Sequence, residues 1–437
     1  MMKSTNSKTG RSTAALLAGM VLLGSAIASG TTNQFRGVNW ADQRDNFQSG
    51  VVYVSGLSST DTYASASVVA DRVVGQFVSK FGSNAVRMPI NETTVSTYWG
   101  TYTGAIDMAL TKGRVVLCFW GSSSGANPPD MTAWWSMWST VVAKYGANPN
   151  FYAEVFNEPS GYNKADLLTL YDQWLQKFPN FPRNRIILDG SGLAMNVPDV
   201  GSDSRFTSCL LAVHDYSFFG SSAWTSDSQW ASSIQGEVGS YSARTVATEW
   251  GGPMSTGSKN GITYQPMNYD VVGTNFFEAY IRGISQQLHD WKMGSFYWPG
   301  LRDGDWYSMT TRSGTGASIV LTVSNQSGLD RMQYSWTDTG TTSIHASMPG
   351  APLSAYPKLT SKGSLLQLEF TPQSTGSGSL ELFGTDGRKV KTFILQTTAG
   401  ENYSRSLDLS NLPNGLYLAS LELDGHPSGS SKVLLKR

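Results

Sequence analysis

The sequence predicts an α/β fold in which a (β/α)8 (TIM) barrel is followed by a small all-β module at the C-terminus. Three observations lead to this prediction. Short apolar runs recur between residues 35 and 300, amphipathic stretches separate several of them, and the pattern changes after residue 340. A strand–helix alternation of this kind, over about 250 to 300 residues, is typical of the barrel. A doubly wound open sheet is the alternative.

The first 30 residues have the features of a secretory signal peptide. Lys3, Lys8 and Arg11 precede the apolar run AALLAGMVLLGSAIA, and an A-x-A cleavage site ends at Ala28. The run is too short to span a bilayer comfortably. We therefore expect residues 1–28 to be a signal peptide, and the mature chain to be secreted or held at the cell surface.

The predicted strands are eight runs rich in Val, Ile and aromatic residues. Most are nearly continuous in hydrophobicity, as expected of strands that are buried on both faces of a parallel sheet. They read FRGVNW (35–40), NAVRMPI (84–90), RVVLCFW (114–120), FYAEVFNEP (151–159), RIILDGSG (185–192), LLAVHDY (210–216), TVATEWG (245–251) and GSFYWPG (294–300).

Helices are predicted where apolar residues recur at helical spacing between these runs. The stretches are 60–80, 131–145, 164–177 and 272–292. Strands and helices together define one domain over residues 33–338.

The pattern changes in residues 339–360, which are rich in Ser, Thr, Gly and Pro and are predicted to form a linker. Residues 361–437 then form a β-rich module. Its predicted strands are SLLQLEF (364–370), SLELFG (379–384), KVKTFIL (389–395), SRSLDL (404–409) and GLYLASLEL (415–423). Asp386–Gly387 and Asn414–Gly415 are hairpin or turn signals.

Composition excludes several classes of partner. Lys+Arg and Asp+Glu are both 32, so the formal net charge is zero, which argues against nucleic acid or an anionic membrane. With 14 Trp, 19 Tyr and 15% charged residues, the chain suits neutral ligands with apolar faces, such as sugars, although an aromatic core is the other interpretation. We expect a monomer.

No Cys/His cluster has metal-ligand spacing, and no phosphate-binding Gly loop or redox motif is present. We therefore expect no cofactor and no metal. Cys118 and Cys209 lie in different apolar runs, and export permits a disulfide between them. The sequence leaves their pairing open.

Candidate functional residues stand at the C-terminal ends of the runs, where barrels of this class place their working groups. Glu158 ends the fourth run and Glu249 the seventh, and a pair of carboxylates is what glycoside hydrolysis requires. Arg87 and Tyr216 could donate hydrogen bonds to one carboxylate and keep it ionised. Further candidates at the same ends are Asn39, Trp40, Trp120, Asn157, His214, Trp250 and Trp298.

The motifs NAVRMPI, FNEP, HDY, TEWG and FYWPG, in this order, resemble those of glycoside hydrolase family 5, the cellulase-like retaining glycosidases. The resemblance covers about residues 33–338. It implies that Glu158 is the acid/base and Glu249 the nucleophile. It also implies supporting or sugar-binding roles for Arg87 and Tyr216 (bonding Glu249), Asn157 (the 2-hydroxyl partner), His214 (the cleavage subsite) and Trp298 (the sugar platform, with a following peptide bond that is often cis and is here made to Pro299).

One departure from the family concerns the third run, where Trp120 occupies the place in which the family commonly carries a histidine. We expect Trp120, Trp40 and Trp250 to bind substrate as well. The reaction type is unaffected, and the default substrate is a plant-type polysaccharide cleaved by an endo-β-1,4-glucanase or hemicellulase. An exo-acting arabinofuranosidase or galactofuranosidase and a non-catalytic glycan-binding barrel are the alternatives.

The C-terminal module resembles the sorting domain of the type IX secretion system of some Gram-negative bacteria. The residues that carry this resemblance are LELFGTDGRKV, LDLSNLPNGLYLASLE and the terminal KVLLKR. The resemblance implies that secretion machinery is a partner of residues 361–437. A small carbohydrate-binding β-sandwich is the alternative.

Overall fold

The structure is a computed structural model. It describes residues 32–45, 49–121, 128, 130–273, 275–336, 358–362, 364–370, 372, 375–384, 388–423 and 426–435. The expected signal peptide and most of the expected linker lie outside these residues. In the part of the chain that is described, no helix is long and apolar enough to cross a membrane.

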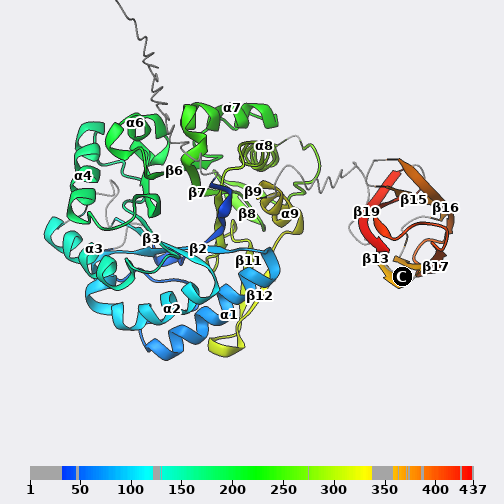
Figure 1. Cartoon of the computed structure of the whole chain (residues 1–437), viewed down its shortest axis with the longest axis horizontal. Coiled ribbons are helices and arrows are strands. Elements are labelled where there is room, and N and C mark those ends of the chain that lie inside the picture. Colours follow the sequence, from blue (N-terminus) through cyan, green and yellow to red (C-terminus); the bar gives the residue numbers. More distant parts are fainter. Residues whose placement is uncertain are drawn as a thin grey trace, which may run out of the picture.

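Eight parallel strands close into a barrel with helices around it (Figure 1), in the order β1-β10-β7-β6-β5-β4-β3-β2. All eight predicted runs are confirmed as strands, and closure of the sheet excludes the open-sheet alternative. The strands are β1 (Arg36–Trp40), β2 (Ala85–Ile90), β3 (Arg114–Phe119), β4 (Phe151–Glu154), β5 (Ile186–Asp189), β6 (Leu210–Tyr216), β7 (Thr245–Gly251) and β10 (Ser295–Leu301).

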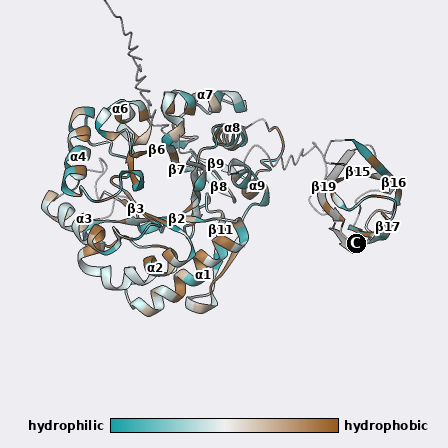
Figure 2. Cartoon of the chain, viewed as in Figure 1, coloured by the Kyte–Doolittle hydropathy of each residue, from teal (hydrophilic) through white to brown (hydrophobic). Residues whose placement is uncertain are grey.

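The helices carry both hydrophobic and hydrophilic residues (Figure 2), as expected of elements with one face on the barrel. Four predicted helices are confirmed (α1, α3, α4 and α8), and α2, α5, α6, α7 and α9 were not predicted. The α-helices are α1 (Tyr63–Phe81), α2 (Trp99–Lys112), α3 (Met131–Tyr145), α4 (Lys164–Lys177), α5 (Ser191–Ala194), α6 (Val197–Gly201), α7 (Asp227–Val238), α8 (Phe276–Trp291) and α9 (Gln326–Ser335).

Shorter elements complete the catalytic domain. Two antiparallel hairpins pair β8 (Gly257–Lys259) with β9 (Ile262–Tyr264) and β11 (Thr310–Ser313) with β12 (Val320–Val323). A π-helical turn spans Thr94–Tyr98, and 3-10 turns span Thr32–Gln34, Gln43–Asp45, Arg183–Arg185, Ser204–Phe206, Gly239–Arg244 and Gly316–Ser318.

The barrel interior is layered along the strands. At the amino ends of the strands, a cluster of buried apolar side chains fills the barrel, and we call it the floor. Its members are Phe35, Ala85, Val116, Tyr152, Ile187, Leu210, Ala212, Val246 and Phe296. Because side chains alternate along a strand, the residues two positions after most of these also face inward. Those residues include Arg87, Cys118, Glu154, Asp189, His214 and Thr248, so a polar layer lies above the floor.

The C-terminal module has its own hydrophobic core, built mainly from leucines between residues 366 and 435. Two antiparallel sheets, β13-β14-β17 and β16-β15-β18-β19, contain all five predicted strands. The strands are β13 (Lys358–Lys362), β14 (Leu365–Phe370), β15 (Gly376–Phe383), β16 (Lys389–Thr397), β17 (Tyr403–Asp408), β18 (Gly415–Leu423) and β19 (His426–Leu435).

Three details of this module differ from the expectation or lie beyond it. β13 begins at Lys358, so the last three residues of the expected linker belong to a strand. Asn414–Gly415 does not form a hairpin, because β17 and β18 lie in different sheets. The turn signal at Asp386–Gly387 lies outside the described residues.

Candidate active site

The two predicted catalytic carboxylates meet at the carboxyl ends of the barrel strands. Glu249 lies on β7, and Glu158 follows β4 by four residues. One oxygen of each carboxylate and a ring nitrogen of His214 all lie within 4.8 Å of one another. The structure therefore brings together two acids and an imidazole from three separate strands or strand ends, as the sequence predicted.

Both oxygens of Glu249 are held by hydrogen bonds. Arg87 donates from Nη1 to Oε1 at 2.6 Å, and the Tyr216 hydroxyl donates to Oε2 at 2.7 Å. The side chain of Glu249 is 5% exposed. Its inward direction depends on a bulge: Val213 on β6 pairs with Ala247, but the next residue, His214, pairs with Glu249. Such a bulge changes the direction of the side chains that follow it.

Glu158 is fixed through its backbone as well as its side chain. Its φ is +52°, in the left-handed region that non-glycine residues rarely adopt. Its N–H donates to Asp189 Oδ2 at 3.1 Å, and its Oε1 lies 3.0 Å from His214 Nδ1. The side chain is 19% exposed, so this carboxyl is more accessible than Glu249.

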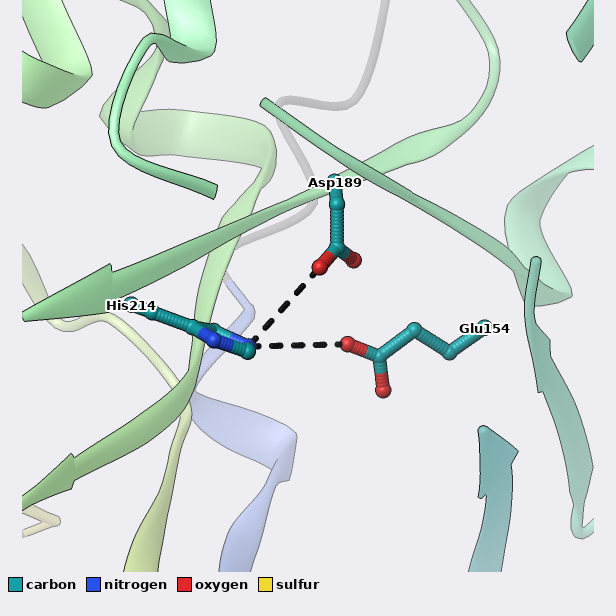
Figure 3. A group of neighbouring side chains, drawn as sticks. All are labelled: Glu154, Asp189 and His214. Carbon is teal, nitrogen blue, oxygen red and sulfur yellow. Dashed lines mark ion pairs between the residues drawn. The ribbon is translucent and has the colours of Figure 1, made fainter. Parts of the chain in front are cut away.

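A buried charge network beneath these groups was not predicted. Arg87 Nε donates to Glu154 Oε2 at 2.5 Å, and Arg87 Nη2 donates to Glu154 Oε1 at 3.2 Å. Figure 3 shows Glu154 and Asp189 converging on His214, whose Nε2 lies 3.9 Å from Glu154 Oε1 and 3.8 Å from Asp189 Oδ2. A charged residue in the middle of an apolar run, as in FYAEVF, is the signal that could have revealed Glu154.

Burial and neighbouring charges shift the pKa values in this network in opposite directions. Burial opposes ionisation of Glu154, but Arg87 and His214 lower its pKa to about 2. Burial and the charge of Glu154 raise the pKa of Asp189 well above its usual range. Burial also opposes protonation of His214, but Glu249 and the other surrounding carboxylates raise the pKa of its imidazole. The network therefore keeps Glu154 ionised and favours the protonated forms of Asp189 and His214.

The side chains of Glu154, Asp189 and His214 have the spacing of metal ligands, within 4.8 Å of one another. Both Glu154 oxygens, however, are already bonded to the guanidinium of Arg87. The Arg87 guanidinium thus supplies the positive charge that a metal ion would bring to Glu154. We therefore interpret Glu154, Asp189 and His214 as part of a charge network rather than as a metal site.

Two of the four tryptophans predicted to bind substrate lie at the mouth of the barrel. Trp120 and Trp298 stack on each other, with ring centroids 5.4 Å apart and an interplanar angle of 17°. Trp298 is half-buried, and Trp120 is 7% exposed. The peptide bond between Trp298 and Pro299 is cis.

The prediction that Trp40 and Trp250 bind substrate is wrong. Both are fully buried. Trp40 follows the inward-facing Asn39 by one residue, and Trp250 follows Glu249, so strand alternation points both indoles away from the interior. Trp40 donates its Nε1–H to the carbonyl of Ser55 at 2.9 Å. These two side chains belong to the core between barrel and helices.

The remaining predicted residues lie around the two carboxylates. Asn39 and Asn157 both accept hydrogen bonds from Arg87, at 2.9 and 2.7 Å. An aromatic residue that the sequence analysis did not single out, Phe218, is 52% exposed. Its ring stacks on Tyr216 at 4.7 Å, so it lies beside a residue that bonds Glu249.

The structure also answers whether the two cysteines form a disulfide, which the sequence left open. Cys118 and Cys209 are both free and buried. Cys118 belongs to the polar layer, where its sulfur lies 3.1 Å from Arg87 Nη2.

Comparison with known proteins identifies the family. The sequence profile described as Cellulase (glycosyl hydrolase family 5) matches residues 48–292, more than half of the chain. A search of curated proteins gives no significant match.

Similar solved structures include an endo-β-1,4-glucanase of Xanthomonas axonopodis pv. citri with a triple mutation, at 14% identity and TM-score 0.48, covering 69% of this chain and 98% of that one. Another is Cel5A (EG2) of Hypocrea jecorina (Trichoderma reesei), at 17% identity and TM-score 0.46, covering 69% and 98%. A third is the endoglucanase Cel5A of Pseudomonas stutzeri, at 12% identity and TM-score 0.42, covering 70% and 95%.

The sequence profile, rather than these distant structural similarities, decides the assignment. Its match runs from before β2 to the end of α8 and includes Arg87, Glu158, His214 and Glu249. The chain therefore belongs to glycosyl hydrolase family 5, and it is a glycosidase that hydrolyses O-glycosyl bonds.

Proposed function

We propose that this glycosidase retains the configuration of the sugar, by double displacement through a glycosyl-enzyme intermediate on Glu249. The observation that supports this is the separation of the two carboxyl groups, whose nearest oxygens lie within 4.8 Å. Retaining enzymes hold these groups about 5 to 5.5 Å apart, whereas inverting enzymes keep them about 6.5 to 9.5 Å apart to admit a water molecule.

The hydrogen bonds suggest how the two acids divide the reaction. Arg87 and Tyr216 hold both oxygens of Glu249, which suits a nucleophile that attacks the anomeric carbon. Glu158 gives its proton to the departing glycosidic oxygen as that bond breaks. It then takes a proton from the water that attacks the same carbon and releases Glu249. Asn157 would donate from its amide nitrogen to the sugar 2-hydroxyl.

The substrate that we propose is a neutral plant-type polysaccharide cleaved internally, by endo-β-1,4-glucanase or hemicellulase action. The cellulase family to which the chain belongs supports this substrate class. Exo-cleavage of arabinofuranosyl or galactofuranosyl side chains is the second candidate. It is favoured by Trp120, because this indole stands where the family commonly has a histidine and covers part of Trp298.

The mechanism is tested with the Glu249→Ala variant and with product stereochemistry. On an aryl glycoside that the wild type turns over, we expect Glu249→Ala to lose at least ~10³-fold in kcat. The first product seen by NMR should have the anomeric configuration of the substrate. Glu237→Gln on α7 is the matched control and should keep full activity. An inverted first product would refute the mechanism.

The substrate class is tested by product profiling on cellulose, xylan, mannan and arabinogalactan. Endo-action should release oligosaccharides of mixed length from one of the first three. Release of single pentose or hexose units from arabinogalactan alone would replace it with the exo-acting candidate.

We also propose that residues 1–28 direct export and that the C-terminal module is recognised by type IX secretion machinery in a Gram-negative host. The signal-peptide features and the module's motifs support this proposal. Deleting residues 358–437 should leave the enzyme inside the cells of a host with this system, whereas the full chain should reach the medium or the cell surface. Equal export of both forms would favour the carbohydrate-binding alternative for the module.

A further inference from the structure

Asp189, at the end of β5, contacts Glu158 by two routes. Its Oδ2 accepts the backbone N–H of Glu158 at 3.1 Å. The same oxygen lies 3.8 Å from Nε2 of His214, within ion-pair distance but beyond hydrogen-bond distance, and that nitrogen is hydrogen-bonded to Thr248 Oγ1 at 3.0 Å. The other ring nitrogen of His214 lies 3.0 Å from the Glu158 carboxyl. One buried carboxyl group therefore holds the main chain of Glu158 directly and acts on its side chain electrostatically, through His214.

The backbone of Glu158 needs such support. The left-handed region is energetically unfavourable for a non-glycine residue, which persists there only where the surrounding contacts hold it. The neighbouring contacts at this turn are Asn157 N–H to the carbonyl of Phe119 at 2.9 Å and Ser160 N–H to the carbonyl of Glu158 at 2.6 Å. Neither of these holds the N–H of Glu158, which is bonded to Asp189.

The second carboxyl oxygen of Asp189 shows that this side chain lowers the stability of the folded protein. Oδ1 is buried, and it has no hydrogen-bond partner among the described residues. A buried polar atom without a hydrogen-bond partner destabilises the folded protein, because it has lost its hydration without gaining a bond. An apolar side chain would avoid this cost, so the bond from Oδ2 to Glu158 is the advantage that Asp189 offers.

We infer that Asp189 is a positioning residue for the acid/base, holding Glu158 in its left-handed conformation so that its carboxyl faces the leaving group. The inference rests on the acid/base role proposed for Glu158. Asp189 itself touches no reacting atom; it acts through the Glu158 backbone and through His214. In Figure 3 Asp189 and Glu154 approach the same end of the His214 ring, and the Glu154 oxygens are already bonded to Arg87.

The test uses the fact that a substrate with a poor leaving group needs the acid catalyst more than a substrate with a good one. An aryl glycoside with a 2,4-dinitrophenyl group needs little proton donation, whereas one with a phenyl group needs it fully. General acid catalysis contributes about 10² to 10⁴-fold. We expect Glu158→Ala to lose kcat/KM on the phenyl substrate and little on the dinitrophenyl one. Asp189→Ala should show the same pattern, with a loss of ~10 to 100-fold on the phenyl substrate and below ~3-fold on the other.

Asp189→Asn is the conservative variant, because its amide oxygen can still accept the N–H of Glu158. It should restore kcat/KM on the phenyl substrate to within ~10-fold of wild type. Asp215→Asn is the matched control. It removes another fully buried carboxyl, and its position between His214 and Tyr216 on β6 turns it to the opposite face of the strand, so the leaving-group pattern should not change. Circular dichroism should first confirm that each variant is folded. The kinetics are then measured at 10 °C, so that a destabilised variant stays folded during the assay.

Three results would overturn the inference: equal loss on both substrates for Asp189→Ala, no loss on either, or an Asp189→Asn variant as impaired on the phenyl substrate as Glu158→Ala. A Glu158→Ala variant without any leaving-group dependence would instead reject the acid/base role of Glu158. The two failures are therefore distinguishable.

Discussion

At the scale of single residues, Arg87 connects the buried acid Glu154 with Glu249, the proposed nucleophile. Its guanidinium donates to Glu154 and Glu249, and also to the side chains of Asn39 and Asn157. Arg87 makes these hydrogen bonds while only 1% exposed to solvent. The planar fork of arginine suits such a set of acceptors, and the ammonium of lysine does not reproduce it.

Arg87→Lys should therefore destabilise the protein and reduce its activity. Breaking a buried ion pair costs about 3 to 5 kcal/mol, because the remaining charge is left without its partner. We expect a loss of free energy of unfolding of that order in urea titrations, together with a lower kcat. Arg36→Lys, at an exposed position on β1, is the control and should change stability by less than about 0.5 kcal/mol. A stable but inactive Arg87→Lys variant would show that the residue serves catalysis alone.

At the scale of elements, the two faces of β6 carry different ionisable groups. His214 and Tyr216 face the pocket, and Asp215 between them faces the helices. Burial raises the pKa of Asp215 to about 7 from 3.8. Burial and the charge of Asp215 raise the pKa of Glu237, on α7, to about 10.

This raised pKa predicts a pH-dependent stability. The folded protein holds the Asp215 proton more tightly than the unfolded chain does, so the associated stability is complete below pH 3.8 and is lost as pH rises to about 7. Asp215→Asn removes this loss. We expect its melting temperature to exceed that of the wild type by several degrees at pH 8. At pH 4 the difference should be small.

The control for this prediction is Asp290→Asn, an exposed position at the end of α8. Its difference from wild type should not change with pH. If Asp215→Asn were no more stable at pH 8 than at pH 4, relative to wild type, Asp215 would not be held neutral by burial.

The same strands show what the sequence could and could not predict. Continuous apolar runs predicted all eight strands, and the positions of the acids at strand ends predicted the pair Glu158 and Glu249. Simple alternation would have excluded Trp40 from the pocket. It would also have turned Glu249 away from it, because Thr248 already faces inward and bonds His214. The bulge on β7 reverses that direction, and nothing in TVATEWG predicts a bulge.

At the scale of the whole molecule, the hydrophobic clusters of the described residues divide between two domains: two clusters, one of them the floor, lie in the catalytic domain, and one lies in the C-terminal module. The catalytic domain packs residues between 35 and 336, and the C-terminal module packs residues between 366 and 435. Each set contains its own strands and sheets. A domain with its own core can fold without its neighbour.

We therefore expect a chain ending at residue 338 to keep the melting temperature of the catalytic domain and its kcat on soluble aryl glycosides. Calorimetry of the full chain should show a second transition that the shortened chain lacks. The matched comparison is activity on insoluble cellulose. A loss there with unchanged kcat on soluble substrate would indicate that the module binds polysaccharide, and a loss on both would show that the two parts depend on each other.

The floor of the barrel limits how water, protons and sugar fragments can enter and leave the active site. Its nine side chains are all buried, and apart from the Tyr152 hydroxyl they are apolar; they fill the amino ends of the strands beneath Arg87 and Glu154. A buried, mainly apolar layer disfavours the passage of protons and water, so we expect them to exchange with the solvent through the mouth of the barrel. A bound glycan would then block this entrance, and under the proposed mechanism hydrolysis of the intermediate would follow only after the leaving fragment has left the mouth.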